Sequence, residues 1–288
     1  MTRRTLLCST GTMIGRANGY DIHLITKHFP RFMEKGIIAG GELMMLPVYY
    51  DRLKEVSDEW LSAGVVFPVI HCEKNVGTLL SDAATADAAG DNAEAAKLRA
   101  QAEEDFRRNC EMGAMAHSSA MVLHLWGGFQ SDAHIDYNVA ALPSLCEIIR
   151  PYGIRLLIEN VPSNTHDPHT NWRRLIPQLE ACDLIFDTRF GQLHRQISET
   201  WADTDIAPHI RHIHISDIVG APRDFSTLRP ILHPGEGMVD FAAFRSILDT
   251  HSYSGTITME SPVIRDGGAD ADKLEDSLAR LKGTLGIA

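Results

Sequence analysis

Residues 155–162 read RLLIENVP, a short apolar run that ends in a glutamate and an asparagine. Short apolar runs recur along the chain, and several are too apolar to have a solvated face. Strands of a parallel sheet have this pattern, because helices cover the sheet on both sides. We therefore predict eight strands: Thr5–Cys8, Glu42–Leu46, Val65–His71, Met121–Leu125, Arg155–Glu159, Leu184–Asp187, His212–Ser216 and Thr256–Glu260.

The stretches between these strands are long enough for helices. The clearest is Asn92–Ala116, which is rich in Ala, Glu, Arg and Leu and contains no proline. Further helices are predicted at Asn138–Arg150, Asn171–Ala181, Phe241–Thr250 and Asp272–Leu281. This alternation predicts an α/β chain that forms one closed (β/α)8 TIM barrel over residues 1–288. A doubly wound open sheet is the alternative, but no GxGxxG follows the first strand.

The composition sets limits on the class of protein. The chain has 288 residues, 44% of them hydrophobic, which is enough for a substantial core. Its net charge of −11 disfavours nucleic acid as a partner. No apolar run has the length of a membrane span or of a secretory signal, so we expect no membrane association. The cysteines are odd in number and scattered, which predicts reduced thiols in the cytoplasm: Cys8, Cys72, Cys110, Cys146 and Cys182.

Six consecutive predicted strands end in a side chain that can bind a metal ion. A barrel gathers such strand ends into one ring, although they are far apart in the sequence. Carboxylates together with imidazole suit Mn²⁺, Mg²⁺, Co²⁺, Fe²⁺ or Zn²⁺. Such an ion can polarise a carbonyl, and a nearby carboxylate can remove a proton from the neighbouring carbon. The six side chains are His71, His124, Glu159, Asp187, His214 and Glu260.

The three carboxylates of this ring need a cation. Glu159, Asp187 and Glu260 would repel one another in a buried ring, and a metal ion removes that cost. His214 lies between two isoleucines, so it points to the opposite side, into the barrel. These four residues are therefore the predicted metal ligands.

Other polar side chains near these strand ends have supporting or open roles. His212 points the same way as His214 but lies one layer deeper, so we interpret it as a hydrogen-bonded core residue. Asp217 is expected to orient the ligands or their loop. His71 and His124 fit two roles equally well, hydrogen bonding to a substrate and binding of a second metal ion.

Five motifs together resemble one known family. They are IEN (158–160), FD (186–187), HIHISD (212–217), PGEGMVDF (234–241) and TMES (258–261). In order and spacing they resemble the sugar phosphate isomerase/epimerase superfamily, the xylose isomerase-like TIM barrels, over nearly the whole chain. This superfamily is related to the metal-dependent AP endonucleases.

The resemblance implies specific roles. In that family the residues equivalent to Glu159, Asp187, His214 and Glu260 bind one divalent ion, and the two glutamates also form the catalytic acid/base pair. The related endonucleases add histidines at the ends of the third and fourth strands to hold further zinc ions. His71 and His124 occupy similar places, so the resemblance allows two metal ions.

The sequence also departs from the family pattern. Many members have a histidine three residues after the sixth-strand Asp, but that position is Phe190 here and the nearest histidine is His194. The Asp-x-His pair that the endonucleases use for a third zinc is missing from RPILHPGEG (229–237), which has only His233. These departures argue against a three-zinc site and against DNA repair.

We therefore expect a metal-dependent isomerase or epimerase of carbohydrate metabolism, active on a small sugar or a related polyol ketone. An inosose-type dehydratase or lyase and a metal-dependent phosphodiesterase or AP endonuclease-like hydrolase are the alternatives. Manganese and zinc are among the candidate ions, and homo-oligomers are common among such barrels. The residues expected to contact the substrate are Trp126, Asn160, His194 and Arg223.

Overall fold

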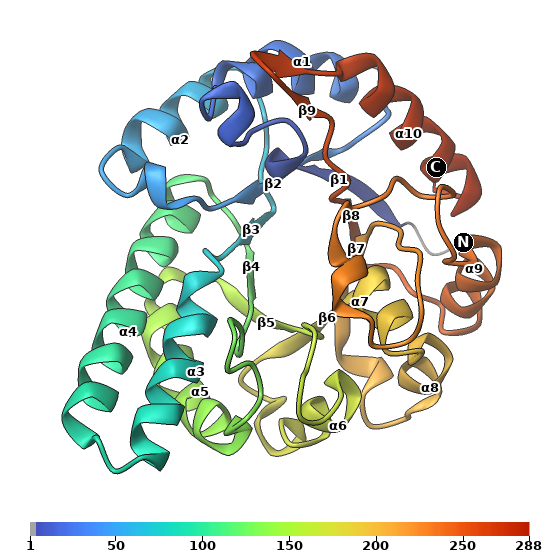
Figure 1. Cartoon of the computed structure of the whole chain (residues 1–288). Helices are drawn as coiled ribbons and strands as arrows, with labels where there is room; N and C mark the ends of the chain where they lie inside the picture. The colour runs from blue at the N-terminus through green and yellow to red at the C-terminus, as the bar shows by residue number, and fades with distance from the viewer. Residues whose placement is uncertain (1–3, 288) are drawn as a thin grey trace.

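The computed structural model describes residues 4–287 and has the predicted architecture. Eight parallel strands close into a barrel in chain order, with the first strand paired to the eighth (Figure 1). The strands are β1 (Thr5–Ser9), β2 (Gly40–Met44), β3 (Val69–His71), β4 (Ala120–Leu123), β5 (Arg155–Glu159), β6 (Asp183–Asp187), β7 (Ile210–Ile215) and β8 (Thr256–Met259).

Helices surround this barrel as an outer ring, and α3 and α4 form a hairpin that extends from one side (Figure 1). A two-stranded ribbon of β9 (Ile264–Arg265) and β10 (Gly268–Ala269) precedes the last helix. The helices are α1 (His23–Glu34), α2 (Leu53–Ser62), α3 (Asn75–Ala88), α4 (Asn92–Met115), α5 (Ile135–Ile149), α6 (Pro168–Arg173), α7 (Thr188–Leu193), α8 (Ile197–Ala202), α9 (Phe241–Thr250) and α10 (Ala271–Thr284).

Two predicted elements are shorter than expected, and prolines explain both. The predicted strand Val65–His71 is wrong in its first half, because β3 begins only at Val69. Pro68 precedes it and has no N–H for the strand ladder. The predicted helix Asn171–Ala181 is also wrong in extent. The helix α6 ends at Arg173, and a separate 3-10 turn follows around Pro177.

The barrel interior has an apolar floor beneath a polar layer. Alternate residues of a strand face the same side, so each side chain at a strand end has an inward neighbour two positions earlier. These neighbours are apolar on β3 to β6 and pack into one buried cluster with Leu7 of β1. The floor holds the polar layer at the C-terminal mouth. The cluster consists of Leu7, Val69, Val122, Leu157 and Ile185.

Two further sequence features have counterparts in the structure. All five cysteines are free thiols. Within residues 4–287, no helix combines the length and apolar character needed to cross a bilayer.

Candidate metal centre

Four strand ends bring the predicted ligands together. Glu159 ends β5, Asp187 ends β6, His214 lies near the end of β7, and Glu260 directly follows β8. One ligand atom from each of the four lies within 4.8 Å of the other three. The Glu159, Asp187 and His214 residues are at most 1% exposed, and the Glu260 side chain is 8% exposed. A set of three carboxylates and one imidazole is therefore assembled in a buried position.

The distances in this set leave room for a shared cation. His214 Nδ1 lies 3.0 Å from Glu159 Oε1 and 3.5 Å from Glu260 Oε2. Asp187 caps helix α7, because its Oδ1 accepts a hydrogen bond from the Phe190 N–H at 2.8 Å. This bond orients the carboxylate and leaves Oδ2 for another partner.

Several buried atoms around this set have no hydrogen-bond partner among the residues that the structure describes. His124 Nε2 does lie 2.6 Å from Glu159 Oε2, but without the angles of a hydrogen bond. Buried polar atoms without partners are rare, because each loses its hydration without compensation. A divalent ion would satisfy several at once, so the residues fit a metal. The atoms are Glu159 Oε2, Asp187 Oδ2, Glu260 Oε1, His71 Nε2 and His124 Nε2.

The titration behaviour indicates an excess of negative charge. Burial, together with the charges of Glu159 and Glu260, raises the pKa of Asp187 to about 7, although Arg189 acts in the opposite direction. Burial alone would lower the pKa of His214, but the surrounding carboxylates raise it well above its ordinary value. A positive charge is therefore favoured at this position.

Glu42 of β2 is an additional buried carboxylate that the sequence reasoning did not assign to the site. It is 0% exposed. Its Oε1 accepts a hydrogen bond from His214 Nε2 at 2.9 Å, and its Oε2 accepts one from His212 Nε2 at 2.8 Å. A carboxylate only accepts, so both Nε2 atoms carry protons. The signal in the sequence was a single charge inside the apolar run GGELMM (40–45).

This arrangement defines what His214 can do. With Nε2–H donated to Glu42, the other nitrogen, Nδ1, faces Glu159 and Glu260. A proton or a metal ion must lie between Nδ1 and these oxygens. Glu42, His214 and a metal would then form the carboxylate–histidine–metal arrangement that fixes the ring and its tautomer.

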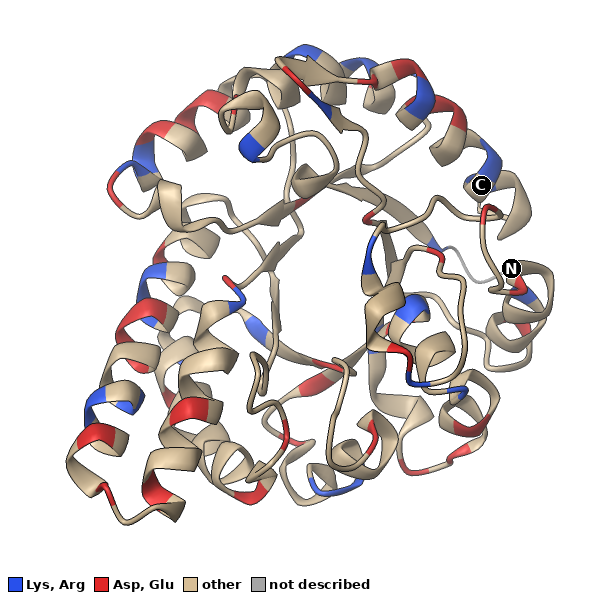
Figure 2. Ribbon diagram, viewed as in Figure 1, with Lys and Arg blue, Asp and Glu red and all other residues tan. Residues whose placement is uncertain are grey.

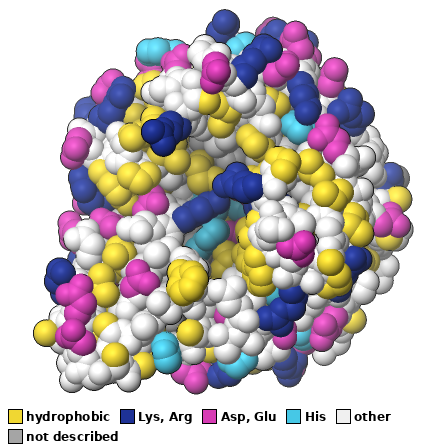
Figure 3. Space-filling model, viewed as in Figure 1, with side chains coloured by type: hydrophobic (Ala, Val, Ile, Leu, Met, Phe, Trp, Pro, Cys, Tyr) yellow, Lys and Arg dark blue, Asp and Glu magenta, His cyan; other side chains and the backbone are white. Residues whose placement is uncertain are grey.

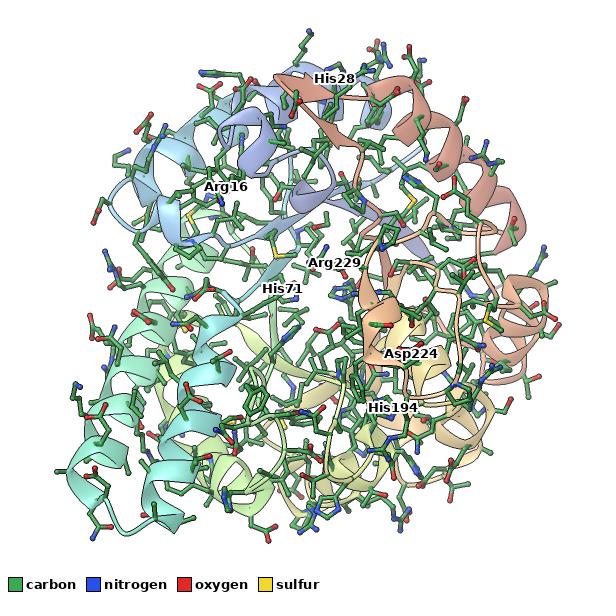
Figure 4. The ribbon with its side chains drawn as sticks, viewed as in Figure 1. Arg16, His28, His71, His194, Asp224 and Arg229 are labelled. Carbon is green, nitrogen blue, oxygen red and sulfur yellow. The ribbon has the colours of Figure 1, made fainter. Side chains whose placement is uncertain are left out.

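His71 and His124 extend the set toward the neighbouring strands. The Nδ1–H of His71 donates to the Cys72 carbonyl at 2.7 Å, and in the neutral ring this leaves the lone pair on Nε2, which lies 3.5 Å from Glu159 Oε2. Figure 4 shows His71 near the centre of the barrel mouth. Burial lowers the pKa of His124 to about 4, which favours the neutral ring that a metal requires. Both predicted roles of this pair stay open.

The four predicted substrate contacts are not among the residues that line the cavity at the barrel mouth. Trp126 is buried and donates to Ser163 Oγ at 3.1 Å. Asn160 bonds both the N–H and the carbonyl of Asp187, at 2.6 and 3.2 Å, and so holds the end of β6. Their role in substrate binding stays a prediction.

The other two predicted substrate contacts, His194 and Arg223, lie on the loops. His194 Nε2 accepts from the Ser163 N–H at 3.3 Å, and its ring packs edge-on against Phe225. Arg223 is exposed and donates to the Asn164 carbonyl at 2.8 Å. Figure 4 shows His194 away from His71, beside the loop that carries Asp224. Substrate contact by either residue also stays a prediction.

Two buried aspartates organise the long loops around the mouth. Asp217 accepts hydrogen bonds from the N–H groups of Gly235, Gly237 and Val239 at 2.9 to 3.0 Å, which holds the PGEG segment. A Cβ on Gly237 would lie 2.4 Å from Asp217 Oδ1, so a glycine is needed there. Asp217 therefore orients its loop, as the sequence suggested.

Asp132 serves the loop after β5 in the same way, and this predicts a pH effect. It accepts from the N–H groups of Asn164, Thr165 and His166 at 2.7 to 2.9 Å. Burial would raise the pKa of Asp132, but these bonds hold it below its ordinary value. The ionised Asp132 therefore stabilises the fold fully at pH values above its pKa in the unfolded chain, which is about 4. This contribution is lost as the pH falls further, through the pKa of the folded state.

We expect Asp132→Asn to be less stable than wild type at neutral pH, with a difference that shrinks as pH falls from about 5 to 3. Urea unfolding at a series of pH values measures this difference. A difference in unfolding free energy that stays constant from about pH 5 to pH 3 would contradict the assignment of this effect to the ionised Asp132.

The sequence of this chain matches one known protein family. Residues 39–284 match the model of the xylose isomerase-like TIM barrel family. The chain belongs to this family. No curated protein matches the sequence.

Solved structures share the fold at low sequence identity. D-allulose 3-epimerase from Methylomonas sp. is 17% identical, with a TM-score of 0.69 and 99% of each chain covered. 3-keto-D-glucoside 4-epimerase, YcjR, from E. coli is 16% identical, with a TM-score of 0.67, covering 98% of this chain and 100% of that chain. The IOLI protein, solved with a zinc atom, is 16% identical, with a TM-score of 0.71 and 98% of each chain covered. At such identities the likeness establishes the barrel fold alone.

Proposed function

We propose that this protein is a divalent-metal-dependent isomerase or epimerase that acts on a small sugar or a related polyol ketone. The observation that carries the proposal is the cluster of Glu159, Asp187, His214 and Glu260, whose ligand atoms lie within 4.8 Å of one another, with the first three residues buried and Glu260 partly buried. The names of similar structures point the same way, since two are sugar epimerases and a third holds zinc.

The chemistry assigned to the chain is proton transfer at carbon. Glu159 Oε2 and Glu260 Oε1 are both free of hydrogen bonds within the described chain, so each can take up a proton. One glutamate removes the proton next to the carbonyl, and the same or the other glutamate returns it. The metal, when bound by the four ligands, supplies positive charge that stabilises the anion formed in between. The buried surroundings exclude water and strengthen these interactions.

Metal content tests the ligand set directly. Protein purified without chelator should contain about one divalent ion per chain, because four ligands complete a single site. Asp187→Asn should lose most of this metal, since an amide oxygen is a poor replacement for a carboxylate. Elemental mass spectrometry measures the metal content of wild type and of the variant. A wild-type protein that takes up no Mn²⁺ or Zn²⁺ would sink the proposal.

Isotope exchange tests the reaction. With Mn²⁺ bound, wild type should transfer deuterium from D₂O to the carbon next to the carbonyl of at least one ketose in a panel that contains D-allulose, D-tagatose and their phosphates. Nuclear magnetic resonance of the recovered sugar shows the position. Exchange with inversion of configuration at that carbon indicates an epimerase. Exchange with movement of the carbonyl group to that carbon indicates an isomerase. Loss of water from the substrate would favour the inosose-type dehydratase or lyase instead.

A second candidate function is a metal-dependent phosphodiester hydrolase, favoured by one observation. His71 Nε2, His124 Nε2 and Glu159 Oε2 are buried without hydrogen bonds within residues 4–287, and they converge beside the first ligand set. Two nearby metal ions suit phosphodiester cleavage. Two ions in wild type, falling to one in a His71→Ala/His124→Ala variant, together with nicking of abasic duplex DNA, would favour this function. A metal content of one ion per chain in both proteins would reject the hydrolase function.

A further inference from the structure

A cavity of about 680 Å³ opens beside Glu260 at the barrel mouth, and four cationic side chains line it. They come from four separate connections: Arg16 after β1, Lys74 after β3, Arg189 after β6 and Arg229 after β7. Figure 3 shows Lys and Arg side chains gathered over the central hollow, with histidine beneath. In the view of Figure 4, the labels of Arg229 and His71 both lie near the centre of the barrel mouth, and the label of Arg16 lies farther out. An acidic protein thus has a local concentration of positive charge at its candidate site.

These cations differ from most others in the protein, because none forms an ion pair with a carboxylate among the described residues. On the outer surface, arginines typically have acidic neighbours, as Arg155 has Asp183 at 2.7 Å. Figure 2 shows such neighbouring blue and red positions along the outer helices. The cations at the mouth are available for a ligand.

Arg189 is built into the wall of the cavity. It is only 5% exposed. Its guanidinium lies over the Phe190 ring, 4.5 Å from the centroid, and its Nη1 donates to the Leu228 carbonyl at 3.0 Å. The Nε–H is buried and has no partner among residues 4–287. A fixed, partly unsatisfied guanidinium is suited to binding an anion.

Two carboxylates share this wall with the four cations, so positive charges outnumber negative charges around the cavity. Glu73 Oε1 accepts a hydrogen bond from the Asn75 N–H at 3.0 Å, and Glu260 belongs to the metal ligands. Arg189 and Arg229 line the same cavity, so an anion bound between them would offset the repulsion between two like charges.

The rest of the wall is apolar and offers few neutral hydrogen-bond partners. Ile14, Met45, Leu46, Ile231 and Ile264 line the cavity, and Ser9 is its one hydroxyl side chain among the described residues. Apolar walls strengthen the field of the cations, because they keep the local dielectric constant low. A neutral polyol would need donors and acceptors along its whole length, which this wall does not offer.

We propose that the substrate is an acid: a small molecule with a carboxylate or phosphate group, bound by Arg189, Arg229, Lys74 and Arg16 at the end away from the metal ligands. This inference rests on the proposed function for the position of the reacting end. The volume of the cavity suits a small molecule.

Binding of matched unreactive probes tests the proposal without turnover. The probes are D-arabinitol, D-arabinonate and D-arabinitol 5-phosphate, which share a five-carbon chain and differ in one ionic group. Isothermal titration calorimetry on protein treated with EDTA keeps the test separate from metal chemistry. We expect at least one anion to bind about tenfold more tightly than arabinitol, with the advantage decreasing as salt is added. The tighter of the two identifies carboxylate or phosphate as the preferred group.

Variants connect the effect to the cavity. Arg229→Gln and Lys74→Gln should each weaken anion binding several-fold and leave arabinitol unchanged. Lys27→Gln, which removes an exposed charge on α1, is the matched control and should change neither. Equal affinity for all three probes, or an equal loss in the Lys27 variant, would overturn the proposal. Displacement of the bound anion by abasic duplex DNA would also overturn it, in favour of a nucleic acid ligand.

Discussion

Glu159→Gln should lower the rate of deuterium exchange by about 10²- to 10⁴-fold, which is the usual contribution of a positioned acid/base group. The amide cannot accept the proton, and its NH₂ group would face His124 Nε2, now 2.6 Å from the carboxylate. Glu260→Gln should have a similar effect on exchange. Single-turnover exchange measured by mass spectrometry gives both rates.

Two controls separate proton transfer from other losses. Glu111→Gln changes an exposed glutamate on α4 and should keep the full rate. Metal content must be measured in every variant, because Glu159 and Glu260 are also assigned as ligands. A variant that retains its metal and loses exchange supports the acid/base role, whereas loss of both shows only ligation. Full exchange in both glutamine variants would reject proton transfer by these residues.

Glu42→Gln should lower Mn²⁺ affinity about 10- to 100-fold, although Glu42 is not among the four assigned ligands. Glu42 holds His214 through the Nε2–H bond at 2.9 Å and so presents Nδ1 to the ligand set. An amide in its place can accept only through one oxygen, while two histidines donate to the carboxylate. Competition with a fluorescent chelator measures the affinity.

Glu42→Ala should also destabilise the fold, by about 3–5 kcal/mol, because the buried histidines lose a charged partner. Thr256→Val provides a control, since it removes only the bond of 2.5 Å between Thr256 Oγ1 and His212 Nδ1. This variant should reduce stability without a comparable loss of Mn²⁺ affinity. If it loses as much affinity as Glu42→Gln, the effect comes from general loosening of the barrel. Urea unfolding and metal titration on the same samples decide between them.

The sequence by itself determined the barrel and the position of the four assigned ligands. Buried parallel strands must be apolar, so a charged group at the end of such a run, as at Glu159 or Asp187, stands out. The order of strands in a barrel then places consecutive strand ends side by side. Both inferences need only local pattern and a known topology, which is why they could be made in advance.

Tertiary structure alone decided the rest of the site. Glu42 gains its role from His212 and His214, some 170 residues further along the chain, and no local pattern encodes that contact. Arg189 and Arg229 share a cavity because long loops fold back over the mouth, and loop paths depend on backbone hydrogen bonds such as those to Asp217. Contacts between residues distant in sequence depend on how the whole chain packs, so only the folded molecule shows which charges are paired and which are free.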